Sequence, residues 1–272
     1  MIINFLIIIQ VIMSNISIIS QNLFNYRKKN TILPGDYIKK YDADYYAFQE
    51  YPDYSGRGRT FYTTIVNAQN QDISKNNYDE INNVWNMFFP WTKMPFRYWS
   101  ETKIEVEGKE IFLINVHIST SYAEPLRLIL LQRLKQLKDK RVILMGDFNA
   151  AFTNQTELVI KENSEFLSMI IKSGYVELLG KDETDANPHY TFAIEDKKKK
   201  RWIRKKLDHV FVSEVMKDDV EIDTSIEYLD STNMNFHKIF SDVGFKNDGI
   251  HKLLKSLAKY AKQRAKCPDM LA

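Results

Sequence analysis

The sequence predicts an α/β domain in which strands and helices form separate layers. Strand-like segments recur along the chain with helical segments between them, a pattern that favours a layered α/β fold over an all-helical one. The strongest strand signal is the apolar run at residues 141–145, which predicts a strand buried on both faces. With 272 residues, 44% of them hydrophobic, the chain is long enough for one large domain. We find no internal repeat and no interdomain linker, so one domain is the simplest prediction.

The elements are justified in chain order by local patterns. Alternating or continuous apolar residues predict strands, and residues 107–110 form a glycine turn between two of them. Apolar residues at helical spacing predict two longer helices, the second ended by Gly174. The predicted strands are residues 14–21, 45–50, 102–106, 111–118, 141–145, 190–194 and 207–212. The predicted helices are residues 36–41, 126–137 and 164–173, and residues 67–83 form a polar surface loop.

The apolar segment at residues 1–13 has three interpretations. It is an extra extension or a misassigned start, a secretion signal or anchor, or a folded first strand. It lacks a basic start and is too short to span a bilayer as a helix. We therefore divide the chain into residues 1–13, a domain at 14–248, and a basic amphipathic helix at 249–272. That helix packs on the domain or, as an alternative, contacts a membrane surface or nucleic acid.

The only cysteine, Cys267, excludes an internal disulfide and a thiolate metal cage. A reducing, cytoplasmic location is the default prediction, and a secreted or membrane-associated one follows if residues 1–13 act as a signal. The net charge is +3, but the basic residues gather at 197–206, predicted as the tip and return arm of a hairpin. This run either binds a polyanion, with Trp202 stacking on a base, or is a solvated charged loop.

Polar residues recur where the apolar strands end, and a layered fold brings such ends to one edge. On extended backbone, Asp147 and Asn149 would point the same way, and Gly146 would let the chain turn there. Carboxylate and carboxamide oxygens without thiolates favour Mg²⁺ or Mn²⁺ over zinc. Such a site suits phosphoester hydrolysis. The residues in question are Asn22, Glu50, His117, Asp147, Asn149 and Asp208.

Six short motifs stand in the order typical of the endonuclease/exonuclease/phosphatase superfamily, and the chain resembles that family from about residue 14 to residue 242. The resemblance implies a four-layered α/β sandwich with two packed mixed sheets between helices, and a Mg²⁺-dependent phosphoesterase site at one sheet edge. The motifs are Gln21-Asn22-Leu23, Phe48-Gln49-Glu50, Asn115-Val116-His117-Ile118, Gly146-Asp147-Phe148-Asn149, Tyr190-Thr191-Phe192 with Leu207-Asp208-His209-Val210-Phe211-Val212-Ser213, and Ser241-Asp242.

Three residues are assigned to the metal by this resemblance. Glu50 resembles the main metal ligand, and Asn22 lies beside it, contacting the metal or the phosphate. Asp242 would lie near the metal and would also take part in catalysis. The implied cofactor is Mg²⁺, or Mn²⁺.

Four further residues resemble the catalytic and phosphate-binding groups of the family. His117 matches the phosphate-binding imidazole, and Asp147 matches the carboxylate that activates or positions water. Asn149 matches the amide that holds the scissile phosphate, and Asp208 would orient a catalytic histidine. We interpret His209 as structural.

The sequence departs from the family pattern at its end. The family's Ser-Asp-His triplet is replaced by Ser241-Asp242-Val243, and valine can neither transfer a proton nor donate a hydrogen bond. Either His237 or His251 takes the missing place, or the protein is an impaired relative that still binds metal and phosphate, or metal-dependent activity remains in a sequence changed after Asp242.

A second departure lies between the glutamate and histidine motifs, where the usual glycine-rich strand is not evident. Aromatic residues gather there instead, and they predict core or sheet-edge packing or, alternatively, a base-stacking or lipid-facing patch. They are Trp85, Phe88, Phe89, Trp91, Phe96, Tyr98 and Trp99.

The leading functional prediction is a divalent-metal-dependent phosphoesterase of the endonuclease/exonuclease type. The isoelectric point near 8.6 and the basic hairpin favour DNA or RNA as the substrate. The alternatives are an impaired member that binds nucleic acid or phosphorylated ligands, and a phosphatase of phospholipids or small molecules. We expect a monomer with no obligate protein partner.

Overall fold

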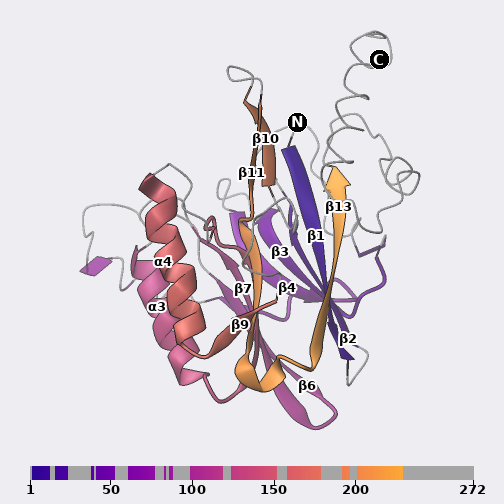
Figure 1. Cartoon of the computed structure of the whole chain (residues 1–272). Coiled ribbons are helices and arrows are strands. Elements are labelled where there is room, and N and C mark those ends of the chain that lie inside the picture. Colours follow the sequence, from indigo (N-terminus) through magenta and orange to yellow (C-terminus); the bar gives the residue numbers. More distant parts are fainter. Residues whose placement is uncertain are drawn as a thin grey trace, which may run out of the picture.

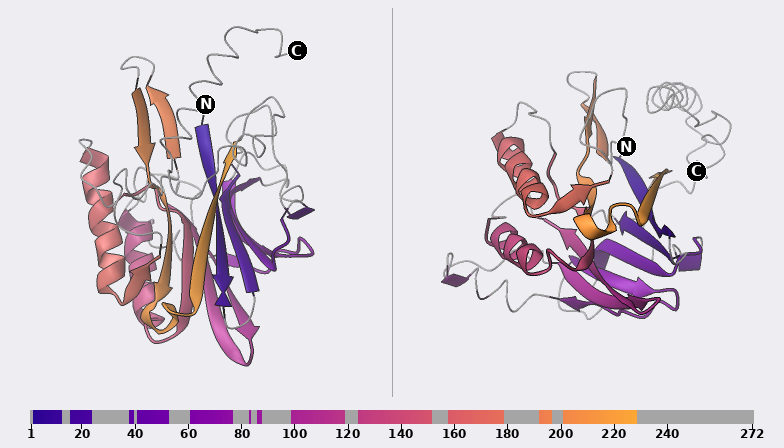
Figure 2. Two further views of the ribbon diagram at one scale, coloured as in Figure 1. Left: turned by 45° about the vertical axis from the view of Figure 1, so that its right-hand side comes forward. Right: turned by 60° about the horizontal axis from the view of Figure 1, so that its bottom comes forward.

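Two mixed β-sheets pack face to face, and two helices cover the outer face of one of them (Figures 1 and 2). The computed structural model describes residues 2–12, 16–23, 38–39, 41–52, 61–76, 83, 86–87, 99–118, 124–151, 158–178, 192–196 and 201–228. The two mixed sheets confirm the predicted α/β fold class. Of the four expected layers, the described residues form three, namely the helices and the two sheets.

Sheet A has the strand order β11-β10-β1-β2-β3-β4, and β13 pairs with the other edge of β1. β2 and β3 run parallel, whereas β1 is antiparallel to β2, β10 and β13. Its strands are β1 (Ile2–Val11), β2 (Ile16–Asn22), β3 (Tyr45–Pro52), β4 (Phe61–Asn67), β10 (Phe192–Asp196), β11 (Arg201–Lys205) and β13 (Val220–Tyr228).

Sheet B has the strand order β5-β6-β7-β8-β12-β9. β7 and β8 are parallel, and β12 is antiparallel to β8. The predicted β6–β7 hairpin is confirmed: Glu107 and Gly108 have φ of 51° and 74°, as a two-residue type I′ turn requires. The strands are β5 (Lys75–Asn76), β6 (Ser100–Val106), β7 (Lys109–His117), β8 (Arg141–Asp147), β9 (Tyr175–Glu177) and β12 (Asp208–Ser213), and a 3₁₀ turn, Glu214–Met216, follows β12.

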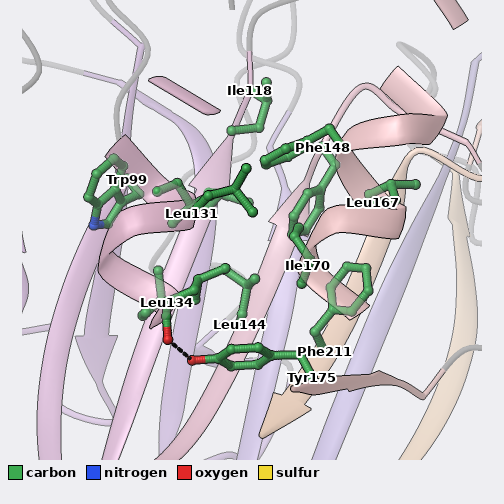
Figure 3. Close-up of a cluster of buried hydrophobic side chains, with 14 of the residues drawn as sticks. Trp99, Ile118, Leu131, Leu134, Leu144, Phe148, Leu167, Ile170, Tyr175 and Phe211 are labelled. Carbon is green, nitrogen blue, oxygen red and sulfur yellow. Dashed lines mark hydrogen bonds between the residues drawn. The ribbon is translucent and has the colours of Figure 1, made fainter. Parts of the chain in front are cut away.

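Helices α3 (Glu124–Gln136) and α4 (Leu158–Lys172) confirm the two longer predicted helices and pack on sheet B. Figure 3 shows the core between them, in which Leu131, Leu134 and Leu167 from the helices meet Leu144 and Phe211 from the sheet. Every residue of β8 from Val142 to Asp147 is buried, as its apolar sequence predicts.

A second core fills the space between the sheets. Alternate residues of the strands point into it, which is the period of two expected of a pleated strand. Its members include Ile7, Ile9, Ala47, Ile65, Leu113, Ile143, Met145, Val210 and Val212. A third apolar cluster lies on the outer face of sheet A, where Ile38 and Tyr41 pack against Tyr46 and Phe48.

The apolar N-terminal segment is a folded strand in this structure. β1 pairs with β13 along Ile3–Val11 and with β2 along Ile7–Val11, and Ile7, Ile9 and Val11 are buried. Of the three interpretations of residues 1–13, this is the third. Residues 249–272 lie outside the described residues. No helix among the described residues has the length and hydropathy needed to cross a membrane.

The basic run at 197–206 contributes the return arm of a hairpin, as predicted. β11 pairs with β10 from Arg201 to Lys205, and this hairpin of sheet A lies at the top of Figure 1. The prediction of one solvated or polyanion-binding run was wrong for Lys206, which is buried and pairs with Glu177. Residues 197–200 lie outside the described residues.

Of the aromatic residues between the glutamate and histidine motifs, Trp99 is buried against Ile114 and Leu130 in the core under the helices. The packing interpretation is therefore confirmed for Trp99. The other six lie outside the described residues.

Candidate active site

Three neighbouring strands of sheet B bring three predicted site residues into one row. β7 and β8 are parallel, so their carboxyl ends share an edge, and β12 begins there because it is antiparallel to β8. His117 and Asp208 are both register partners of Asp147. All three side chains are buried. We call this edge, where β2, β3, β7 and β8 end and β12 begins, the rim.

Asn22 joins this row from the other sheet. Its side-chain nitrogen Nδ2 donates a hydrogen bond of 3.1 Å to Asp147 Oδ2. His117 Nε2 lies 3.6 Å from the same oxygen, beyond ordinary hydrogen-bond length. The rim therefore places a carboxylate between an amide and an imidazole. The sequence predicted these residues for one site, and the structure brings them together.

Asn149 lies next to this group but not in the predicted way. We expected extended backbone from Asp147 to Asn149, and this was wrong, because Asn149 has a left-handed φ of 47°. Its backbone nitrogen donates to Asp147 Oδ1 at 2.8 Å, and its side-chain nitrogen donates to the Ile118 oxygen at 2.8 Å. Asparagine tolerates this conformation better than most residues and commonly closes such local turns. The turn fixes both oxygens of Asp147, since Asn22 holds the other one.

The prediction that Gly146 turns the chain at the end of β8 was wrong, because β8 continues in register to Asp147. The glycine is required by a close approach. A β-carbon there would lie closer than 3.0 Å to the Val116 carbonyl oxygen and 3.0 Å from Asn115 Oδ1. Gly146 thus allows β7 and β8 to stay paired up to the rim.

Glu50 lies at the rim end of β3, with a buried side chain and a φ of 55°. The pairing of β3 with β4 shifts its register between Phe48 and Tyr51, so Glu50 lies in a bulge. A left-handed glutamate is an uncommon and costly conformation that surrounding contacts must enforce. Gln49, the preceding residue, is the register partner of Asn22 in β2. Glu50 therefore lies near the end of β3, on the same side of the molecule as Asp147.

A buried amide pair holds this bulge against sheet B. Gln49 Nε2 donates to Asn115 Oδ1 at 2.5 Å, and Asn115 Nδ2 donates to the Phe48 and Thr64 oxygens, both at 2.9 Å. Asn115 is on β7, two residues before His117. Both amides belong to the six short motifs, but no role for them was predicted from the sequence. Their signal was a carboxamide inside an otherwise apolar strand, which must find partners when buried.

The donor set at the rim is chemically suited to a hard cation, because it offers carboxylate and carboxamide oxygens. Among the described residues, however, no group of three or more His, Cys, Asp or Glu side chains gathers closely enough to hold a metal ion. Asp242, the third predicted ligand, lies outside the described residues with the whole Ser241-Asp242-Val243 triplet, His237 and His251.

The structural interpretation of His209 agrees with its surroundings. Its ring is buried, with Nδ1 at 3.2 Å from Glu177 Oε1 and Nε2 at 2.8 Å from the Ala150 oxygen. Glu177 and Lys206 form an ion pair of 2.8 Å beside this histidine, and the sequence did not predict this pairing. Glu177 is the last residue of the three-residue strand β9 and lies between Val176 and Leu178, and this charged residue in an apolar segment was the signal in the sequence.

No family model matches the sequence, and a comparison with curated proteins finds no significant similarity. Solved structures do resemble it. The endonuclease domain of TRAS1, a telomere-specific non-LTR retrotransposon, is 13% identical with a TM-score of 0.48, covering 78% of this chain and 99% of that one. D. rerio TDP2, complexed with single-strand DNA product, is 20% identical with a TM-score of 0.46, covering 73% and 83%. The 3′-5′ exonuclease NExo from Neisseria meningitidis is 14% identical with a TM-score of 0.43, covering 67% and 81%.

The order of the six motifs and the two mixed sheets packed face to face agree with one another. Both observations agree with the resemblance of the chain to the endonuclease/exonuclease/phosphatase superfamily.

Proposed function

We propose that the chain is a divalent-metal-dependent phosphoesterase that hydrolyses phosphate esters of nucleic acid. The observation that carries the proposal is the buried Asp147 carboxylate, which is held by Asn22 and the Asn149 backbone, with His117 beside it and Asp208 across from it. Buried carboxylates and an imidazole gathered at one edge of a fold serve catalysis more readily than stability, because burying them is costly.

Each side chain then has a role that its chemistry permits. Asp147, whose orientation is fixed at both oxygens, accepts a proton from the attacking water and aims it at phosphorus. His117 donates a hydrogen bond to a non-bridging phosphate oxygen. Asn149 holds the scissile phosphate, and Asp208, the register partner of Asp147, would orient a histidine.

Glu50, Asn22 and Asp242 are the residues that would hold the cation. Mg²⁺ needs only one or two protein carboxylates because it keeps several of its waters. When bound, it would neutralise charge on the phosphate and the leaving oxygen. The strained backbone of Glu50 supports this assignment, since strain of this kind is retained at functional sites.

Nucleic acid is the proposed substrate because of the strand that leads to the rim. β11 carries Arg201, Arg204 and Lys205 and continues through two residues into Asp208. A polyanion that runs along this hairpin would enter the rim with its phosphates, and its affinity would fall steeply with salt.

The test is hydrolysis of plasmid DNA and of bis-p-nitrophenyl phosphate with Mg²⁺ or Mn²⁺. Asp147→Asn keeps the shape of the side chain and removes its basicity, so we expect turnover to fall by a factor of about 100 or more. Asp139→Asn, at an exposed position outside the rim, is the matched control and should keep full activity. Metal-independent turnover, or an Asp147→Asn variant as active as the control, would contradict the proposal.

The second candidate is an impaired member that binds nucleic acid without efficient hydrolysis. It is favoured by Val243, which stands where the family has a histidine. Under this alternative the wild type binds DNA in a salt-dependent manner but turns over little, and Val243→His raises turnover at least tenfold. If Val243→His leaves an inactive wild type inactive, the valine is not what limits the reaction.

A further inference from the structure

A cluster of three ionisable side chains lies buried behind the rim, outside the group described above. Lys206 Nζ is 2.8 Å from Glu177 Oε1, and the two side chains are 1% and 0% exposed. His209 Nδ1 is 3.2 Å from the same oxygen, and its side chain is 0% exposed. Glu177 is therefore at the centre of the cluster, and both basic side chains meet at one of its oxygens.

The cluster lies on the helix side of sheet B, whereas Asp208 points the other way. His209 stacks on Phe211 at 5.8 Å between ring centroids and meets Phe148 edge-on at 5.6 Å. Both phenylalanines belong to the core under α3 and α4. Successive residues of a strand face opposite sides, so Asp208 faces sheet A, from which Asn22 reaches the rim.

Stability alone gives no reason for such a cluster. Removing charges from water is energetically costly, and apolar residues of similar volume often stabilise a core equally well. The surrounding side chains are aromatic and aliphatic, which makes the cost high here. What the cluster adds is precise positioning of the chain segments that it joins, since hydrogen bonds fix positions that apolar packing leaves looser.

The segments that are positioned in this way belong to the rim. His209 Nε2 lies 2.8 Å from the Ala150 oxygen, and because a carbonyl only accepts, Nε2 must carry the hydrogen. The Phe148 nitrogen donates to the Leu207 oxygen at 2.8 Å. The turn that carries Asn149 is thus tied on both sides to the segment that carries Asp208.

The same geometry defines the protonation of the cluster. With a hydrogen on Nε2, the contact between Nδ1 and Glu177 is a hydrogen bond only if a second proton lies between them. His209 is then an imidazolium beside a carboxylate, or a neutral ring beside a carboxylic acid. In either form the pair holds one proton more than a neutral histidine and an ionised glutamate, and this gives it a spectroscopic signature.

We propose that Glu177 is a positioning residue of the proposed hydrolase, which acts through His209 and Lys206 to hold the Asn149 turn in register with Asp208. This inference rests on the proposed function for its effect on turnover. The claim that Glu177 positions the Asn149 turn does not depend on the proposed function, because the position of this turn can be measured without any substrate.

The decisive variant replaces the buried ion pair as a whole. Glu177→Met with Lys206→Met removes both charges at nearly constant volume, and such exchanges are often neutral or stabilising. We expect the double variant to fold with a thermal midpoint close to that of the wild type, while kcat on bis-p-nitrophenyl phosphate falls about 10-fold to 100-fold and KM stays within about twofold. Glu177→Gln keeps an acceptor for Lys206 and should recover most of the lost kcat. Glu214→Gln, at an exposed position, is the matched control.

Nuclear magnetic resonance supplies the readout that does not need activity. In the wild type, both ring nitrogens of His209, or Nε2 with a Glu177 carboxyl proton, should show bound hydrogens. The Asn149 backbone N–H, which donates to Asp147 Oδ1, should exchange with solvent about 10-fold faster in the double variant.

The outcomes separate the two proposals. A folded double variant with wild-type kcat and unchanged Asn149 exchange would overturn the positioning role. Loss of Asn149 protection in a protein that never hydrolyses phosphate esters would support the positioning role and overturn the proposed function. If the double variant does not fold, His209→Phe, which removes the link between Glu177 and the Ala150 oxygen, is measured in its place, and unchanged Asn149 exchange would then count against the proposal.

Discussion

The close approach of β7 to Gly146 yields a prediction that the structure makes quantitative. In Gly146→Ala, the new β-carbon would lie closer than 3.0 Å to the Val116 oxygen and 3.0 Å from the Val116 nitrogen. Neither atom can give way, because both belong to a backbone that is paired with β8 up to His117 and Asp147. In addition, the φ of 128° at this position is one that side-chain-bearing residues rarely adopt.

The magnitude follows from these two terms. A sparsely populated backbone conformation costs about 1–3 kcal/mol, and overpacking of a buried site costs about 1–3 kcal/mol. We therefore expect Gly146→Ala to lower the free energy of unfolding by about 2–6 kcal/mol, a large part of the usual total of about 5–15 kcal/mol. Turnover should fall as well, because the next residue pair along these strands is His117 with Asp147.

Gly108→Ala is the matched control for this experiment. Gly108 also has a positive φ, of 74°, but a β-carbon there would meet nothing within 4 Å. Strain alone should cost about 1–2 kcal/mol in this variant. The assay is equilibrium unfolding in urea, with the free energy taken from the midpoint at an unchanged slope. If Gly146→Ala costs no more than Gly108→Ala, the close approach of β7 is not what requires the glycine.

Three further predictions concern buried groups. Tyr175→Phe removes the 2.9 Å hydrogen bond to the Leu134 oxygen and should lower the free energy of unfolding in urea by about 1 kcal/mol. Burial raises the pKa of Tyr175 well above its usual range, so this difference between wild type and variant should be complete at neutral pH and shrink above pH of about 10. A difference that does not depend on pH would contradict this prediction. Glu50→Gly should be more stable than Glu50→Ala by about 1 kcal/mol, the reverse of an ordinary strand, since glycine adopts the φ of 55° freely; equal midpoints would refute the strain. Asn115→Leu removes the hydrogen bonds that Asn115 donates to the Phe48 and Thr64 oxygens and should cost about 2–4 kcal/mol, whereas a loss below about 1 kcal/mol would show that the amide pair is dispensable.

Local chemistry in the sequence was sufficient for most elements. The apolar run of β8, the Glu107-Gly108 turn and the apolar spacing of α3 and α4 each depend on residues close together in the chain, so their patterns could be interpreted without the fold. The same is true of the rim, because polar residues at the ends of parallel strands must share an edge. Asn22, His117, Asp147 and Asp208 were found together for this reason.

Strand pairing over long distances was beyond such patterns. The apolar segment at the start of the chain is a strand that pairs along Ile3–Val11 with β13, more than 200 residues later. The strand after the basic hairpin likewise leaves sheet A for sheet B, where β8 and β9 cover its two edges. Nothing in the local sequence of 207–212 distinguishes the two sheets.

The amino-acid sequence by itself determined the α/β class, most strand and helix positions and the polar residues of the rim, because these depend on short-range periodicity and on strand ends. Only the tertiary structure decided that Gly146 serves a close approach, that Asn149 is left-handed, and that Lys206 is buried on Glu177. The physical reason is that each of these depends on atoms from a distant part of the chain, whose position is determined by packing and not by neighbouring residues.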